Sequence, residues 1–210
     1  MEGGRDNPSH RIDPRERQGA FVAVVGPSGV GKDTLLAYAR GRLGAGERTP
    51  VHFVRRVITR PADGSTEDHD SLSPEAFERA LASGAFALSW QAHGLRYGLP
   101  ESVDRHIAAG HTVVANLSRA ALDALRARYR HVQVVAIAAS PETLARRLAA
   151  RGRESSDEVS ARLARASAPA RDLGGAVVSI INDGQVEDAG DALVAAIRAA
   201  GDMAAAPVDL

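Results

Sequence analysis

The chain has 210 residues, which is enough for one large domain with a substantial hydrophobic core. Lysine plus arginine equals aspartate plus glutamate, at 26 each, so the net charge indicates no general affinity for nucleic acid or for a membrane surface. The absence of cysteine excludes disulfides, thiolate metal ligands and cysteine nucleophiles. No apolar stretch reaches membrane-spanning length and residues 1–18 are too polar for a signal peptide, so we expect a cytoplasmic protein.

Apolar runs alternate with segments of helical periodicity along most of the chain. The patterns predict strands at 20–25, 51–59, 111–117, 132–138 and 176–182, and an extended segment at 86–91. They predict helices at 32–43, 74–83, 100–109, 118–129, 141–151, 157–170 and 186–200. Strands that alternate with helices form a parallel sheet covered by helices on both faces, and ligands bind at its carboxyl edge. We therefore predict one α/β domain over 19–200, between disordered, flexible tails at 1–18 and 201–210.

A glycine-rich loop joins the first predicted strand to the first predicted helix. It reads Gly26-Pro27-Ser28-Gly29-Val30-Gly31-Lys32-Asp33-Thr34. In this setting backbone N–H groups converge on an anion and Lys32 adds positive charge for the outer phosphates, so the motif predicts a bound nucleoside triphosphate. Asp33 stands where a Ser or Thr normally meets magnesium, and Thr34 offers a hydroxyl one residue later. Both are candidate contacts to Mg²⁺ through water, and Asp33 is also compatible with a simple helix cap.

Arginines gather between the helices predicted at 141–151 and 157–170. Phosphoryl transfer needs positive charge that follows the moving phosphoryl group, and an arginine-bearing loop with a glycine hinge can close over bound phosphates. We interpret residues 144–165 as such a lid. Three of its arginines are expected to contact phosphates: Arg147, Arg151 and Arg162.

Residues 60–98 break the strand–helix rhythm, and we interpret them as an inserted lobe that binds the phosphoryl acceptor. In the strand predicted before this lobe, Arg56 lies on one face and Arg60 lies at the carboxyl end, toward the ligand edge. Glu67 and His69 follow in a polar loop, where they suit either the binding of hydroxyls or a solvated turn.

The remaining polar and aromatic residues indicate no separate chemistry. His69, His93, His106 and His111 show no metal-ligand spacing, and Trp90 fits a core position better than a stacking platform. No Ser-His-Asp or paired-carboxylate arrangement emerges, which argues against a hydrolase. A kinase whose acceptor is a phosphate needs no general base, because the second pKa of a phosphate monoester is about 6 and its oxygen is largely ionised at neutral pH.

Taken together, these motifs resemble the guanylate kinase-like group of P-loop kinases over roughly positions 20–200. The matching segments are Gly26 to Thr34, Thr59-Arg60-Pro61 with Glu67-Asp68, Phe77 to Phe86, Tyr97-Gly98-Leu99-Pro100, Arg147-Leu148 with Arg151-Gly152, Arg162-Leu163 and Ile181-Asn182-Asp183. The resemblance implies a guanylate kinase-like fold with an inserted acceptor-binding lobe and a lid, and ATP and Mg²⁺ as cofactors. It assigns four residues to ATP and the transition state: Lys32, Arg147, Arg151 and Arg162. It also implies that Asn182 lies beside the adenine and that Arg60 and Tyr97 contact the acceptor.

The acceptor pocket departs from that of guanylate kinases, which resemble this chain but read guanine with a glutamate and with aspartates. The aligned positions here are Leu88, Asn116 and Ser118. The N–H donors of guanine would meet no carboxylate, and each donor left unpaired in a buried pocket costs about 1–3 kcal/mol. We therefore expect a pocket that rejects guanine and holds another acceptor through Arg56, Arg60, Glu67, His69, Tyr97 and Asn116.

The loop ending in Gly-Lys-Asp-Thr, the segments 57–63 and 90–95, and Tyr97 to Pro100 are similar to the branch of the group that phosphorylates ribose 1,5-bisphosphate in bacterial phosphonate degradation. That similarity implies a sugar phosphate as substrate and transfer of the γ-phosphoryl of ATP to its 1-phosphate, giving 5-phosphoribosyl 1-diphosphate. Two alternatives stay open: a guanylate or other nucleoside monophosphate kinase, and a non-catalytic guanylate kinase-like module that binds peptides. A homodimer is compatible with the sequence, which predicts no membrane or nucleic-acid partner.

Overall fold

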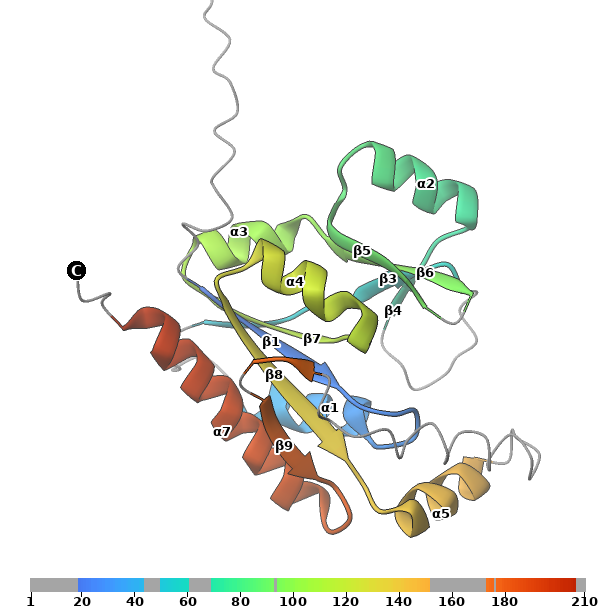
Figure 1. The fold of residues 1–210 in the computed structure, drawn as a ribbon, viewed down its shortest axis with the longest axis vertical. Coiled ribbons are helices and arrows are strands. Elements are labelled where there is room, and N and C mark those ends of the chain that lie inside the picture. The colour runs from blue at the N-terminus through green and yellow to red at the C-terminus, as the bar shows by residue number, and fades with distance from the viewer. Residues whose placement is uncertain are drawn as a thin grey trace, which may run out of the picture.

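The computed structural model describes residues 19–43, 50–60, 69–92, 94–151, 173–175 and 177–206. A five-stranded sheet forms its centre (Figure 1). The strand order is β2 (Val51–Phe53), β7 (Thr112–Asn116), β1 (Ala20–Val25), β8 (His131–Ala138) and β9 (Val177–Ile181). All neighbouring pairs run parallel, so the carboxyl ends of the strands share one edge, as the alternating sequence pattern predicts.

Helices cover both faces of this sheet (Figure 1). One face carries α1 (Lys32–Arg42) and α7 (Val186–Ala205), and the other carries α3 (Ser102–Ala108) and α4 (Leu122–Arg128), which follows the 3₁₀ turn η2 (Arg119–Ala121). Helix α5 (Pro141–Arg151) begins just beyond the carboxyl end of β8. No helix in the described part of the chain is long and apolar enough to span a bilayer.

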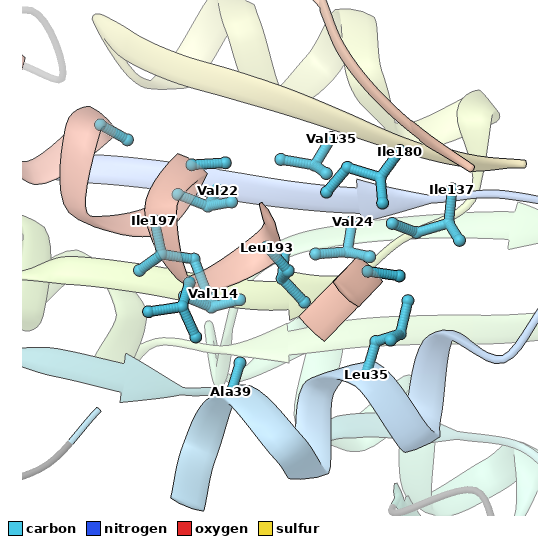
Figure 2. Packing of buried hydrophobic residues seen from close by; sticks show 14 of the residues in the cluster. Val22, Val24, Leu35, Ala39, Val114, Val135, Ile137, Ile180, Leu193 and Ile197 are labelled. Atoms are coloured by element: carbon cyan, nitrogen blue, oxygen red, sulfur yellow. The ribbon is translucent and has the colours of Figure 1, made fainter. Parts of the chain in front are cut away.

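The central strand β1 is buried along its whole length because both of its faces are covered. Val22 and Val24 pack with Leu193 of α7 and with α1, as Figure 2 shows. Phe21 points to the opposite face, where it stacks on the ring of Tyr129 with 5.5 Å between centroids. A strand buried on both faces reads as a continuous apolar run, which is why the segment was predictable.

A second sheet stands beside the first and is built from residues 56–100. Its order is β4 (His69–Ser71), β3 (Arg56–Ile58), β6 (Leu95–Pro100) and β5 (Phe86–Ala92), with α2 (Pro74–Ala82) packed on it. β3 and β4 run parallel, whereas β6 runs antiparallel to β3 and β5. Phe77 of α2 stacks on Phe86 at 4.6 Å between ring centroids and anchors this helix to the sheet.

The prediction of one strand over 51–59 was wrong. The segment is two strands in two different sheets: the backbone N–H of Val54 still donates to Val114 of β7 at 2.9 Å, but from Arg56 onward the chain pairs with β6 and β4. Sequence alternation continues through the bend, so it does not reveal the change of partner. Helix α7 runs to Ala205, beyond the predicted end at 200, because small buried residues continue its apolar stripe. The helix predicted at 157–170 lies outside the described residues.

Candidate active site

The phosphate loop leaves β1 and enters α1 at the carboxyl edge of the parallel sheet. Gly31 caps α1 with a left-handed backbone (φ 96°), and the backbone N–H of Leu35 closes the first helical turn on its carbonyl at 3.0 Å. The first N–H groups of a helix have no partner within it, so they remain available to an anion. The Lys32 ammonium folds back over the loop and donates to the carbonyls of Gly26 at 2.8 Å and Pro27 at 3.0 Å.

Two side chains from beyond the loop brace its backbone. The Asn182 amide donates to the carbonyl of Val30 at 2.8 Å, and the Arg147 guanidinium donates to the same oxygen at 3.2 Å. Asn182 is buried, and a Cβ on Gly31 would lie 2.5 Å from its amide nitrogen. Glycine at position 31 therefore permits both the left-handed turn and this close approach. Two residues that the sequence assigned to the nucleotide thus lie at the loop itself.

The base of α5 is tied to the end of β9. The Asp183 carboxylate accepts from the backbone N–H of Ser140 at 2.8 Å, and the Ser140 hydroxyl accepts from the N–H of Thr143 at 3.2 Å. The hydrogen bond from Ser140 is the main cause that lowers the pKa of Asp183 below its ordinary value. This arrangement fixes the start of the helix that carries Arg147.

The side chains of Asp33 and Asn116 contact each other beside the loop. The Asn116 amide, at the carboxyl end of β7, donates to the Asp33 carboxylate at 3.1 Å. Both line a cavity of about 120 Å³ that also borders Arg56. Thr34 is exposed, whereas Asp33 is half-buried and faces this cavity. A carboxylate oxygen suits Mg²⁺, so Asp33 fits a magnesium contact better than Thr34 does.

Three side chains from three strands of the second sheet form a stack. The Arg56 guanidinium lies 5.7 Å from the centre of the Tyr97 ring. Tyr97 also stacks on Trp90, with ring centroids 5.3 Å apart and ring planes 9° from parallel. Arg56 is only 7% exposed, which is unusual for a cation. Trp90 is buried, as predicted, but within the described part of the chain its indole N–H has no hydrogen-bond partner. The stack brings the predicted residues Arg56 and Tyr97 together.

The role of Trp90 beside Tyr97 escaped the sequence reasoning, although a signal was present. β5 and β6 form a hairpin that turns at Gly94, whose φ is 73°, and its register sets Trp90 opposite Tyr97. A glycine between two runs of strand-like residues is the usual mark of such a turn. Counting residues outward from Gly94 along the two strands pairs Trp90 with Tyr97 and places both rings on the same face of the hairpin.

The other predicted acceptor residues lie around this stack or beyond the described chain. His69 of β4 is half-buried and is the register partner of Arg56, and Arg60 follows the end of β3. The neighbouring Arg55 is exposed; it donates to the carbonyl of His69 at 3.1 Å and pairs with Asp70 at 3.1 Å. Glu67 and Arg162 lie outside the described residues, as does the side chain of Arg151 at the end of α5.

The positions aligned with guanine-reading carboxylates carry no charge. Leu88 is buried in the apolar cluster with Trp90 and Leu99, and the Asn116 amide donates a hydrogen bond to the Asp33 carboxylate. Among the described residues the hydroxyl of Ser118 is buried without a hydrogen-bond partner. The described structure therefore has no carboxylate at these three aligned positions.

The family model described as guanylate kinase matches residues 18–200, nearly the whole chain. The chain belongs to the guanylate kinase family. Its α/β fold with a phosphate loop, a five-stranded parallel sheet and an additional mixed sheet is that of the family. Guanylate kinase from Anaplasma phagocytophilum shares this fold, with a TM-score of 0.59 at 18% identity over 87% of this chain and 86% of that one.

Curated relatives within the family are more similar in sequence. "Ribose 1,5-bisphosphate phosphokinase PhnN" of Chelativorans sp. (strain BNC1) is 52% identical over 186 residues, which cover 88% of this chain and 87% of the relative. The proteins of the same name from Brucella melitensis biotype 2 and Pseudofrankia inefficax are 54% and 49% identical, over 80% and 95% of this chain and 86% and 98% of theirs. The resemblance predicted from the motifs is confirmed.

Proposed function

We propose that this chain is a ribose 1,5-bisphosphate phosphokinase, which transfers the γ-phosphoryl of ATP to the 1-phosphate of ribose 1,5-bisphosphate and releases 5-phosphoribosyl 1-diphosphate and ADP. The observation that carries this proposal is an intact phosphate loop in a chain that has Leu88, Asn116 and Ser118 at the positions aligned with the carboxylates that guanine needs. Relatives of about 50% identity that bear this name support it.

The chemistry needs positioning and charge rather than a base. An oxygen of the acceptor phosphate, already ionised at neutral pH, bonds to the γ-phosphorus while the bond from that phosphorus to the β–γ bridging oxygen of ATP breaks. The loop amides and Lys32 would hold the triphosphate, and Arg147, Arg151 and Arg162 would neutralise the charge that spreads over the moving group. Bound Mg²⁺ would screen the phosphates, held on the protein side by Asp33 through water, with Thr34 the weaker candidate.

The acceptor would lie against the stack of the second sheet. The buried Arg56 supplies a fixed charge for one phosphate, His69 is its register partner on β4, and Arg60 follows the end of β3. Tyr97 would present its hydroxyl to the sugar, and Asn116 would close the pocket on the loop side. Two phosphates on one small acceptor require several cations, and Arg56 and Arg60 supply two of them.

The test is phosphorus NMR of the products formed from ATP with ribose 1,5-bisphosphate, with GMP or with AMP. We expect a new diphosphate signal with the sugar bisphosphate and little product with either nucleotide. Equal turnover of GMP would favour the nucleoside monophosphate kinase alternative. Absence of ATP binding in calorimetry would favour the non-catalytic binding module. A homodimer and a cytoplasmic location stay predictions, which light scattering and cell fractionation test.

A further inference from the structure

Three histidines meet at the edge of the parallel sheet opposite to the phosphate loop. His52 lies in the edge strand β2, His106 near the end of α3, and His111 in the turn that leads into β7. β7 begins at Thr112, which pairs with Ala20 at the start of β1. The cluster therefore lies at the amino ends of the strands, whereas the loop follows their carboxyl ends. The sequence spacing of these residues gave no sign of the cluster, because its members come from three elements.

The three imidazoles are close enough to share one ligand. The Nε2 atom of His52 lies 2.9 Å from the Nδ1 atom of His111, and the rings of His52 and His106 stack with centroids 3.7 Å apart. One ring nitrogen from each histidine can be chosen so that all three lie within 4.8 Å of one another. In a tetrahedral zinc site, bonds of about 2.0–2.1 Å place ligand nitrogens about 3.3 Å apart. Small rotations of half-buried side chains would close the difference.

The packing of the three rings favours neutral imidazoles. All three histidines are half-buried, and the rings of His52 and His106 stack directly on each other. Two charged imidazoles stacked at this distance would repel each other, whereas neutral imidazoles are the form that binds metals. His52 and His106 also line an open cavity of about 430 Å³, through which solvent can reach the cluster.

We propose that His52, His106 and His111 together bind one divalent transition-metal ion, with zinc as the first choice and solvent as the fourth ligand. Three histidines with an open position suit zinc, while magnesium prefers oxygen ligands. The ion would join the short edge strand β2 to α3 and to the start of β7. The site is separate from the phosphate loop, so the proposal does not rest on the kinase function.

The first test uses the full-length chain, stripped of metal by a chelator and kept free of nucleotide. Calorimetric titration with zinc chloride is expected to give one ion per chain at micromolar affinity, and cobalt chloride to give the visible absorption bands of tetrahedral Co²⁺. Zinc at a hundredfold excess over its Kd should raise the Tm by at least about 5 °C.

Variants of the cluster show whether zinc binds at these three histidines or at other histidines of the chain. His106→Ala and His52→Gln should each weaken zinc binding at least tenfold and abolish the cobalt bands, with circular dichroism confirming that the chain stays folded. The matched control is His131→Ala, because His131 is also half-buried at the amino edge, where burial lowers its pKa, but does not belong to the cluster. Its zinc affinity should equal that of the unmodified chain.

Two results would overturn the proposal. One is an unmodified chain that binds neither zinc nor cobalt with a Kd below about a millimolar. The other is a variant lacking all three histidines that binds zinc as tightly as the unmodified chain. In either case the cluster is a packed group of neutral rings, and the kinase assays would be unaffected.

Discussion

The phosphate loop and the Arg56–Tyr97–Trp90 stack are built in opposite ways. The loop is nine consecutive residues whose backbone N–H groups form the site, so the motif alone locates it. The stack takes one side chain from each of β3, β6 and β5, and its geometry depends on the register of the second sheet. A site made of backbone groups can be located from a short contiguous sequence, whereas a site made of side chains from several strands can be located only once the tertiary fold is known. The difference predicts where single substitutions act: on catalysis at the loop and on acceptor binding at the stack.

The largest effect is expected at Lys32. Lys32→Ala removes the ammonium that lies over the loop, so kcat should fall at least about a thousandfold while the fold is retained. Steady-state kinetics with circular dichroism as the fold control measures this. Retention of more than a tenth of the activity would contradict the assignment.

Lys32 is also the only lysine of the chain, which allows a second measurement on the unmodified protein. An amine-specific reagent can modify only this side chain and the N-terminal amine. ATP should slow modification of Lys32 without affecting the N-terminus, as peptide mass spectrometry would show. Equal labelling with and without ATP would contradict a contact between Lys32 and the nucleotide.

Arg56 provides the test of the stack. Arg56→Ala should raise the KM for the acceptor about ten- to a hundredfold and leave the KM for ATP within about twofold, because a hydrogen bond to a charged group is worth about 1.5–3 kcal/mol. Arg56→Lys keeps the charge and should recover part of the loss. The matched control is Arg55→Ala, since Arg55 is exposed and pairs with Asp70 instead. Equal effects of the two alanine variants would mean that general charge, not the stack, binds the acceptor.

Asn182 tests whether the loop depends on more than its own nine residues. Asn182→Ala removes a hydrogen bond to the Val30 carbonyl and should weaken ATP binding about five- to tenfold. Calorimetry measures the Kd. Because Arg147 donates to the same oxygen, the effects of Asn182→Ala and Arg147→Ala should not be additive. Strict additivity would indicate that the two side chains act independently of the loop.

The comparison also explains what the sequence could and could not predict. The parallel sheet and the loop follow from apolar runs and one contiguous motif, and the structure confirms both. The bend after Val54 escaped prediction because the alternation of β2 continues into β3 while the partner strand changes. The contact between Asp33 and Asn116 escaped as well, since residues 83 positions apart meet only once β1 and β7 are paired. Register and partner choice are properties of the tertiary fold.

The smallest effect is expected at Asp183. This residue acts on the phosphate loop only indirectly, because it fixes the start of α5, the helix that carries Arg147. Its pKa is lowered mainly by the backbone N–H of Ser140, so the folded chain holds this proton less tightly than the unfolded chain does. The carboxylate therefore stabilises the fold above its ordinary pKa of 3.8, and this contribution is lost as the pH falls through the lowered value in the folded chain. Asp183→Asn keeps an acceptor oxygen but removes the charge, so its urea midpoint should lie below that of the unmodified chain at pH 7 and approach it as the pH falls below 3.8. A difference that stays constant over this range would assign the effect of the substitution to packing rather than to ionisation. Because Asp183 is exposed and lies outside the loop, kcat at pH 7 should change by less than about threefold, in contrast with the loss expected at Lys32.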